Sequence, residues 1–404
     1  MSKKVDYAEG KVMKKAKFFL IALLLVLAIT GVCFGEEGNK TYVLITVDVG
    51  CQHDKESLDA LTWGRAGTGE TYGITRIMDI CDSFNVKATF FVNVWEWKTY
   101  SEAEMRRVCE VIKERGNDVQ LHTHLSTAYD KDREWPFQYS LKEQIEIMKH
   151  GRELTYKWLG EYPIAHRAGG YGADYNTLKA MKATDFFIDS SMLLDDKRCK
   201  LNQPLLTRNG VVMSDGVLEI PVTVVSTERE KITLGPIILK EYENYQKVDI
   251  DWMNEAELIS AIKAAEEAGL RTVTLFMHSW SLIKTPKKWS DMDYSHLQPD
   301  NEDISDLNNV LKYTASNEDI DVVTVREFYN LYSGNPAIIK GPDTILLQNQ
   351  AKWVNQNVFY WAFKNFSGSR KAQLVVIGTA VILGVICFGV ILWIKKKIWI
   401  KEEA

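Results

Sequence analysis

Apolar segments rich in β-branched residues alternate with amphipathic segments through most of this chain of 404 residues. The apolar segments show no polar alternation, which is typical of strands buried on both faces; they include 42–48, 88–92 and 272–278. The amphipathic segments have apolar residues at helical spacing; they include 101–115, 140–159 and 253–269. Strands that alternate with helices favour parallel pairing. Six or seven such alternations therefore predict one barrel-like α/β domain.

Polar side chains lie at or just past the C-terminal ends of the predicted strands: Asp48, His122, His124, Arg167, Asp189 and His278. Because this end of a β/α barrel carries the active site, we expect most of them to share one site. His122 and His124 occupy alternate positions of one strand and would face the same side. Two imidazoles placed in this way can bind one divalent cation at about 2.0–2.1 Å. The alternative is a pair of strand-end histidines bonded to backbone or water.

Both ends of the chain carry an apolar segment next to lysines. Residues 18–34 follow a lysine-rich start and predict either a signal peptide cleaved near Gly35 or a retained signal anchor. Residues 374–394 are long enough for a helix to cross a hydrocarbon core of ~30 Å, and three lysines follow at once. Positive charge marks the cytoplasmic side, so the region between the two segments is predicted to be extracellular, in a single-pass or two-pass membrane protein.

These features predict five segments: a signal or anchor (1–35), the barrel domain (36–335), a juxtamembrane linker (336–372), a transmembrane helix (373–394) and a cytoplasmic tail (395–404).

The formal net charge of −5 gives no basic excess for binding nucleic acid. An oxidising exterior permits disulfides, but the spacing does not determine a pairing among the cysteines outside the apolar segments, which are Cys51, Cys81, Cys109 and Cys199.

Several motifs in this order resemble the polysaccharide deacetylases of the NodB-homology type, carbohydrate esterase family 4. The similar segments span 42–332 and are Thr46-Val47-Asp48-Val49-Gly50, Ala88-Thr89-Phe90-Phe91-Val92, His122-Thr123-His124, Arg167-Ala168-Gly169-Gly170-Tyr171-Gly172, Asp189-Ser190-Ser191 and Leu275-Phe276-Met277-His278. The resemblance implies a distorted β/α barrel of seven or eight strands. It also implies an enzyme that uses a divalent metal, expected to be zinc, to remove acetyl groups from amino sugars.

By the same resemblance, Asp48 is expected to be the catalytic base and His278 the acid. Arg167 would orient the catalytic carboxylate, with Asp189 in support. His122 and His124 would bind the metal. The sequence departs from the family at two positions, since Val49 stands in place of an aspartate ligand and Ser126 in place of a histidine. His124 can replace that histidine, whereas the third ligand is left open among Asp54, its neighbour His53, and Asp48 itself.

The resulting hypothesis is a membrane-anchored, extracellular, metal-dependent deacetylase that hydrolyses N-acetyl or O-acetyl groups of a cell-surface polysaccharide. Its partners would be an acetylated glycan substrate and the membrane. One alternative is a catalytically inactive glycan-binding protein on the same fold, because the substitutions at Val49 and Ser126 affect the metal motif. A second alternative is a metal-dependent hydrolase of small amides.

Overall fold

The computed structural model describes residues 40–50, 57–65, 69–126, 129–201, 205, 207–234, 236–347, 353–357 and 378. The chain divides into two units, Met1–Lys40 and Thr41–Ala404, and all described elements belong to the second. The predicted N-terminal apolar segment, and all of the C-terminal one except residue 378, lie outside the described residues. Within the described part, no helix has the length and apolar character needed to span a membrane.

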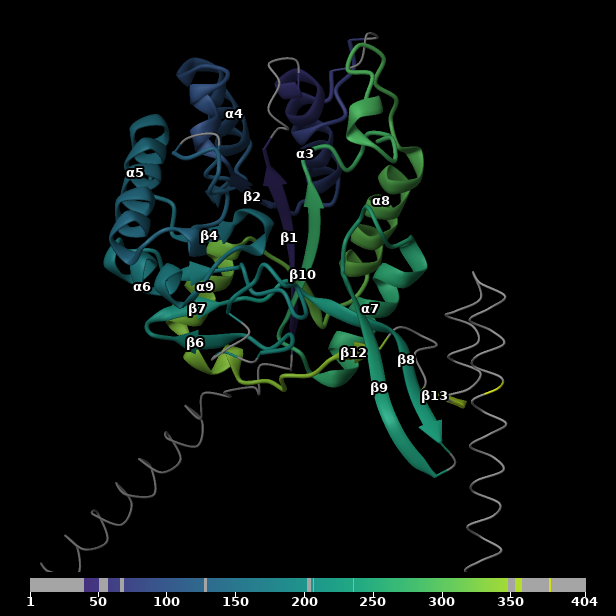
Figure 1. Ribbon diagram of the computed structural model, residues 1–404. Coiled ribbons are helices and arrows are strands. Elements are labelled where there is room, and N and C mark those ends of the chain that lie inside the picture. Colours follow the sequence, from purple (N-terminus) through teal and green to yellow (C-terminus); the bar gives the residue numbers. More distant parts are fainter. Residues whose placement is uncertain are drawn as a thin grey trace, which may run out of the picture. The chain divides into compact units, whose positions relative to one another are not determined.

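A single curled sheet organises the second unit, with strand order β10-β1-β2-β3-β4-β5-β7-β6 and with β11 beside β1 (Figure 1). Its strands are β1 (Thr41–Val49), β2 (Thr89–Val92), β3 (Asp118–Thr123), β4 (Ala165–Ala168), β5 (Ile188–Asp189), β6 (Val212–Ser214), β7 (Val217–Glu219), β10 (Thr272–His278) and β11 (Ile320–Val322). Every neighbouring pair from β10 to β7 is parallel, and only β6 and β7 are antiparallel within that order. The prediction of parallel pairing is therefore confirmed.

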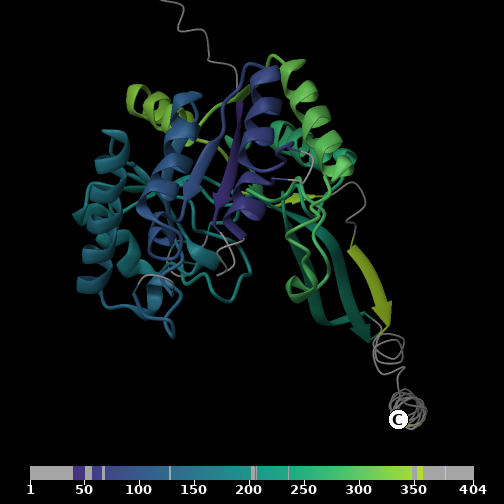
Figure 2. The same cartoon turned by 90° about the horizontal axis from the view of Figure 1, so that it is seen from above.

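Helices connect the strands and cover the outside of the sheet (Figure 2). The covering helices are α3 (Ile74–Ser83), α4 (Glu102–Glu114), α5 (Leu141–Leu159), α6 (Tyr175–Ala183), α7 (Glu255–Ala268) and α8 (Asn301–Ala315), whereas the last helix, α9 (Val325–Gly334), packs inside the curl. The Ser101 side chain caps α4 by accepting from the Glu104 amide, as expected for a capping serine three residues before a glutamate. Gly269 ends α7 with a φ of 71°, a conformation that favours glycine.

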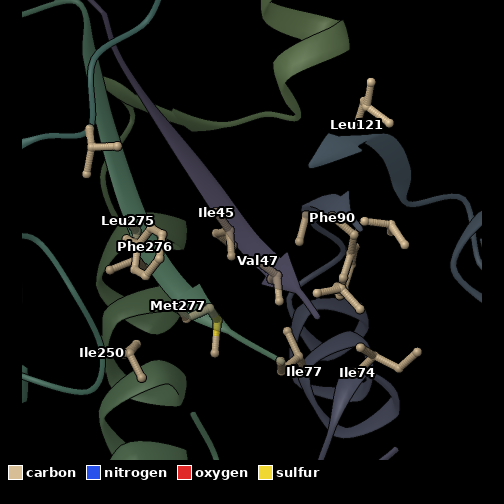
Figure 3. Close-up of a cluster of buried hydrophobic side chains, with 14 of the residues drawn as sticks. Ile45, Val47, Ile74, Ile77, Phe90, Leu121, Ile250, Leu275, Phe276 and Met277 are labelled. Atoms are coloured by element: carbon tan, nitrogen blue, oxygen red, sulfur yellow. The ribbon is translucent and has the colours of Figure 1, made fainter. Parts of the chain in front are cut away.

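Alternate residues of β1 pack on opposite faces of the sheet. Ile45 and Val47 belong to the cluster between the sheet and its covering helices, and Figure 3 shows Val47 near Ile77 of α3. Leu44 belongs to a second cluster inside the curl, where Phe328 of α9 also packs. The helix α9 thus closes the N-terminal end of the barrel interior, and the polar side chains lie toward the other end.

The sheet is brought toward closure by single hydrogen bonds, without a regular ladder between β7 and β10. The Val248 amide donates to the Thr223 carbonyl at 2.9 Å, and the Phe276 amide of β10 donates to the Val248 carbonyl at 2.9 Å. The Thr274 amide of β10 donates to the Thr223 hydroxyl at 2.8 Å. Pro221 has no N–H, which interrupts ladder bonding in this segment. The α/β class is confirmed, and the curled sheet is consistent with a distorted barrel.

A long antiparallel hairpin, β8 (Val224–Leu234) and β9 (Ile237–Lys247), extends from the barrel (Figures 1 and 2). Two short strands pair parallel to β8, namely β12 (Leu346–Leu347) and β13 (Trp353–Asn357). Within residues 193–247 the sequence pattern indicates an extended segment only for 217–225, so most of this hairpin was not predicted.

Cys81, Cys109 and Cys199 are buried and form no disulfide with one another, and Cys51 lies outside the described residues. Burial raises the pKa of the Cys81 and Cys109 thiols to about 12, so both remain protonated near neutral pH.

Candidate functional site

A cleft of about 270 Å³ opens at the C-terminal ends of the strands. Four of the predicted site residues line it, namely Asp48, His122, His124 and His278. The register of the parallel pair β1 and β10 places Asp48 beside His278. The register of β3 and β4 places His122 beside Arg167. Most of the polar strand-end residues therefore share one site, as predicted.

Arg167 is fully buried behind the cleft and holds Asp48. Its Nη1 donates to Oδ1 of Asp48 at 2.8 Å and to the Thr46 hydroxyl at 3.1 Å. Its Nε and Nη2 donate to the Ser190 carbonyl and hydroxyl at 3.0 and 2.9 Å. The guanidinium carbon lies 4.3 Å from the ring centroid of Phe91. Because these contacts fix the guanidinium on several sides, they position Asp48 with little freedom.

Asp48 remains ionised although it is buried. Burial by itself raises the pKa of this carboxyl, but electrostatic interactions with His122, Arg167 and His278 and the Arg167 hydrogen bond together lower it below its ordinary value. Burial also lowers the pKa of His122 to about 3, so this imidazole is neutral near pH 7. Arg167 is therefore the permanent charge that stabilises the Asp48 carboxylate.

Hydrogen bonds define the tautomer of both histidines of the His-X-His motif. Nδ1 of His122 donates to the Arg167 carbonyl at 2.9 Å, which leaves the lone pair on Nε2. This Nε2 lies 3.7 Å from Oδ2 of Asp48. Nδ1 of His124 lies 3.2 Å from Oε1 of Glu134, so its lone pair is likewise on Nε2. The ring centroids of the two histidines are 4.8 Å apart, which confirms that both face one side.

The glycine-rich loop allows His124 to lie close to the backbone. A Cβ atom at Gly169 would lie 2.6 Å from the Thr123 carbonyl and 2.8 Å from Nδ1 of His124. Any larger residue would displace the imidazole or the strand end. Close approach to His124 is therefore a physical reason for glycine at this position.

His278 lies at the end of β10, beside Asp48, and has a carboxylate partner of its own. Its Nδ1 lies 3.3 Å from Oδ2 of Asp251, and its ring stacks on Trp280 with centroids 4.4 Å apart. Burial raises the pKa of Asp251, but hydrogen bonds and the His278 charge outweigh this and lower it. An ionised Asp251 orients His278, which lines the cleft.

A second buried cluster, whose Lys247 and Tyr171 also line the cleft, was not predicted. The Lys247 amine lies 2.8 Å from Oδ2 of Asp249 and 3.1 Å from the Tyr171 hydroxyl. Burial lowers the pKa of Lys247, but Tyr171 and Asp249 raise it above its ordinary value, so the amine stays charged. The sequence signal that could have indicated this region is Asp249-Ile250-Asp251, where two carboxylates occupy alternate positions just as His122 and His124 do.

Two predicted site residues do not join this group. Asp189 is fully buried, does not line the cleft, and accepts from Ser191 Oγ at 2.8 Å and from His166 Nδ1 at 2.9 Å. Ser190, the next residue, contacts Arg167 instead. Asp54, predicted as a metal ligand, lies outside the described residues, as does His53.

The cleft contains two imidazoles and a carboxylate, side chains of the kinds that bind divalent cations. Nε2 of His122 and of His124 carry the lone pairs, and Oδ2 of Asp48 lies 3.7 Å from the first of them. Two ligands of one tetrahedral zinc are about 3.3 Å apart when each bond is about 2.0–2.1 Å, so Asp48 is near this range. Among the described residues, however, no three His, Cys, Asp or Glu side chains form a metal-binding group.

Comparison with known proteins finds likeness only among solved structures. No family model matches the sequence, and no curated protein matches it. A putative polysaccharide deacetylase from Mycobacterium smegmatis is 17% identical, with a TM-score of 0.47 over 78% of this chain and 96% of that chain.

The peptidoglycan deacetylase PdaC from Bacillus subtilis is 14% identical, with a TM-score of 0.35 over 74% of this chain and 95% of that chain. Puue allantoinase is 11% identical, with a TM-score of 0.45 over 74% and 92%. The structural neighbours thus include the deacetylase family that the sequence motifs resemble.

Proposed function

We propose that this chain is a metal-dependent hydrolase that removes acetyl groups from a carbohydrate, with N-acetyl groups of a cell-surface polysaccharide as the preferred substrate. The observation that carries the proposal is that one cleft holds two positioned groups and a pair of oriented imidazoles. Arg167 holds Asp48 beside His122 and His124, and Asp251 holds His278 at the end of the neighbouring strand. The order of motifs that resembles the polysaccharide deacetylases supports it.

The residues of the cleft supply an acid and a base for amide hydrolysis. The ionised Asp48 accepts a proton from the attacking water, whose oxygen bonds to the acetyl carbon. As the C–N bond breaks, His278 donates a proton to the departing amine, so the products are acetate and a free amino sugar. A cation held by His122 and His124, with Asp48 or Asp54 as a third ligand, would lower the pKa of water and polarise the acetyl carbonyl.

Aromatic side chains around the cleft suit a sugar substrate. Tyr171, Trp252 and Trp280 all line it. Trp252 is 60% exposed, which leaves much of its ring accessible at the mouth of the cleft. Large aromatic rings with accessible faces can pack against the apolar faces of sugar rings. Tyr171 and Trp280 are buried, so the accessible ring of Trp252 is what supports a carbohydrate in preference to a small amide.

Acetate release tests this proposal. The metal-loaded protein should release acetate from an N-acetylated amino-sugar oligomer. Asp48→Asn should lower the rate by about 10²–10⁴, the usual contribution of general acid–base catalysis. Metal content is measured in parallel, because loss of metal in Asp48→Asn would identify Asp48 as a ligand. A folded, metal-loaded protein that binds such oligomers without releasing acetate would favour the inactive glycan-binding protein.

We further propose that the enzyme is anchored in the cell membrane through residues 374–394, with the barrel outside. The support is the length of this apolar segment and the lysines that follow it. Protease added to intact cells should digest the barrel and spare the C-terminal tail. Digestion that requires lysis would contradict this orientation.

A further inference from the structure

The tip of the β8–β9 hairpin presents a group of exposed apolar side chains. Leu234 is 41% exposed, and Ile237, Ile238 and Leu239 are 58%, 50% and 51% exposed. The ladder pairs Leu234 with Ile237 and Thr233 with Ile238, so these side chains gather at one end of the hairpin. A contiguous apolar group on an otherwise polar element indicates a contact surface.

The part of the hairpin between the barrel and the tip, which we call the shaft, carries cross-strand ion pairs. Arg229 faces Glu243 across the ladder, with Nε and Oε1 2.8 Å apart. Lys231 faces Glu241, with Nζ and Oε1 2.6 Å apart. Cross-strand ion pairs stabilise a ribbon whose faces meet water. Along the hairpin, the Lys231–Glu241 ion pair is thus followed within a few residues by the exposed apolar side chains of the tip.

Strand β13 shows where the chain goes after the barrel. It runs parallel to β8, and its last residue, Asn357, pairs with Thr233, next to the tip. The chain therefore leaves the described structure at the apolar end of the hairpin. Only residues 358–373 separate this point from the predicted transmembrane segment. Fully extended, this linker spans at most about 60 Å. They include Phe359, Tyr360, Trp361, Phe363 and Phe366, a composition typical of membrane–water interfaces.

We propose that the tip of the β8–β9 hairpin, formed by Leu234 and Ile237 to Leu239, contacts the lipid surface of the bilayer in which the chain is anchored. This inference rests on the anchoring proposed above. Side chains that immerse in the interface remove their apolar surface from water. The exposed Lys240 follows them directly and is placed to meet lipid headgroups. Together with the C-terminal segment, the tip gives the barrel a second attachment, which limits its rotation relative to the membrane.

Site-specific photocrosslinking of the full chain tests the contact. A benzophenone amino acid is placed at Ile238, or at Met213 of β6 as a control, since Met213 is 40% exposed and belongs to the barrel sheet. The protein is reconstituted in phosphatidylcholine–phosphatidylglycerol vesicles, illuminated and analysed by mass spectrometry. We expect lipid adducts at Ile238 and none above background at Met213. Equal adducts at both positions, or crosslinks from Ile238 to a second copy of the chain, would overturn the proposal.

A tip variant separates this contact from the anchor and from catalysis. With the probe at Ile238, the pair Ile237→Asp and Leu239→Asp should abolish the lipid adducts, while the chain stays resistant to carbonate extraction and releases acetate from a soluble oligomer at an unchanged rate. Adducts that persist in this variant would overturn the contact. Extraction of the unmodified chain by carbonate would overturn the anchor and the inference with it. Lipid adducts from a chain that releases no acetate would refute only the deacetylase proposal.

Discussion

The Arg167 guanidinium spans the barrel interior from β4 to reach Asp48 on β1, with Nη1 2.8 Å from Oδ1. Arg167 is 0% exposed and Asp48 is 7% exposed. Burying two charges this far from water costs desolvation free energy, and each charge is compensated only by its partner. The pair therefore links the stability of the barrel to the geometry of its candidate site.

Replacing only one partner of this pair should destabilise the protein strongly. Arg167→Met leaves Asp48 as a buried, uncompensated carboxylate and should lower the free energy of unfolding by about 3–5 kcal/mol. Urea denaturation measures this. The control is Arg107→Met, which removes an arginine that is 57% exposed in its pair with Glu114, and should change stability by at most about 1 kcal/mol. Adding Asp48→Asn to Arg167→Met should restore part of the loss, and a further loss would contradict the ion-pair explanation.

A change at Glu134 should weaken metal binding without removing a proposed ligand. Glu134→Gln keeps the size of the side chain but removes the charge that orients His124 and raises the basicity of its Nε2. Loss of such a partner typically lowers metal affinity by about 10–100-fold. Calorimetric zinc titration of the metal-stripped protein measures the affinity. Glu114→Gln, at an exposed position on α4, is the control, and equal affinities in the two variants would contradict the role of Glu134.

The sequence predicted which edge of the sheet carries the site because a strand-end position can be identified from the apolar segment before it. The sequence predicted less well to which face of the sheet each strand-end side chain points. In β5, which is only Ile188–Asp189, the apolar Ile188 packs inside the curl and turns Asp189 to the opposite side. A strand of two residues has no alternation from which this could be deduced. Asp189 was therefore assigned to the cleft on its position alone.

Residues in irregular segments escaped prediction for a related reason. Asp249 joins β10 only through an isolated bridge to Phe276, so neither a strand nor its end is visible in the sequence there. The position of Asp251 beside His278 depends on this long-range contact. The β8–β9 hairpin was missed because its charged shaft lacks the apolar alternation of a half-buried strand.

Asp251 should affect catalysis by positioning His278. In the acetate-release assay, Asp251→Asn should lower kcat more than it raises KM, because the His278 ring loses its orienting carboxylate. The loss in kcat should be at most about 10²–10⁴, the contribution of general acid–base catalysis. The pH profile of kcat/KM should shift as well, whereas a merely structural role would leave it in place. Asp251→Glu should recover part of the rate. Asp293→Asn, at a carboxylate 62% exposed, is the control.

A pair of buried acids on the outer face of the sheet should make stability depend on pH. Asp189 and Glu219 are neighbours in the β5–β7 ladder, and both are fully buried. Oδ2 of Asp189 and Oε2 of Glu219 have no hydrogen-bond partner within the part of the chain that the structure describes. One proton shared between the two oxygens would satisfy both. Burial, and then the neighbouring Asp189, raise the pKa of Glu219 well above its ordinary value.

The direction of the pH effect follows from this raised pKa. The folded state retains the Glu219 proton at pH values where the unfolded state has released it, so the stabilisation is fully present below the unfolded pKa and declines as pH rises toward the folded pKa. The unfolding free energy should therefore fall as pH rises above the ordinary glutamate pKa of about 4.3, by at most about 1.4 kcal/mol per pH unit. Glu219→Gln keeps an N–H donor for Asp189 but cannot ionise, so its curve should be flatter in urea denaturation across this range. Glu114→Gln should follow the unmodified protein, and parallel curves for the unmodified protein and Glu219→Gln would show that Glu219 does not hold the proton.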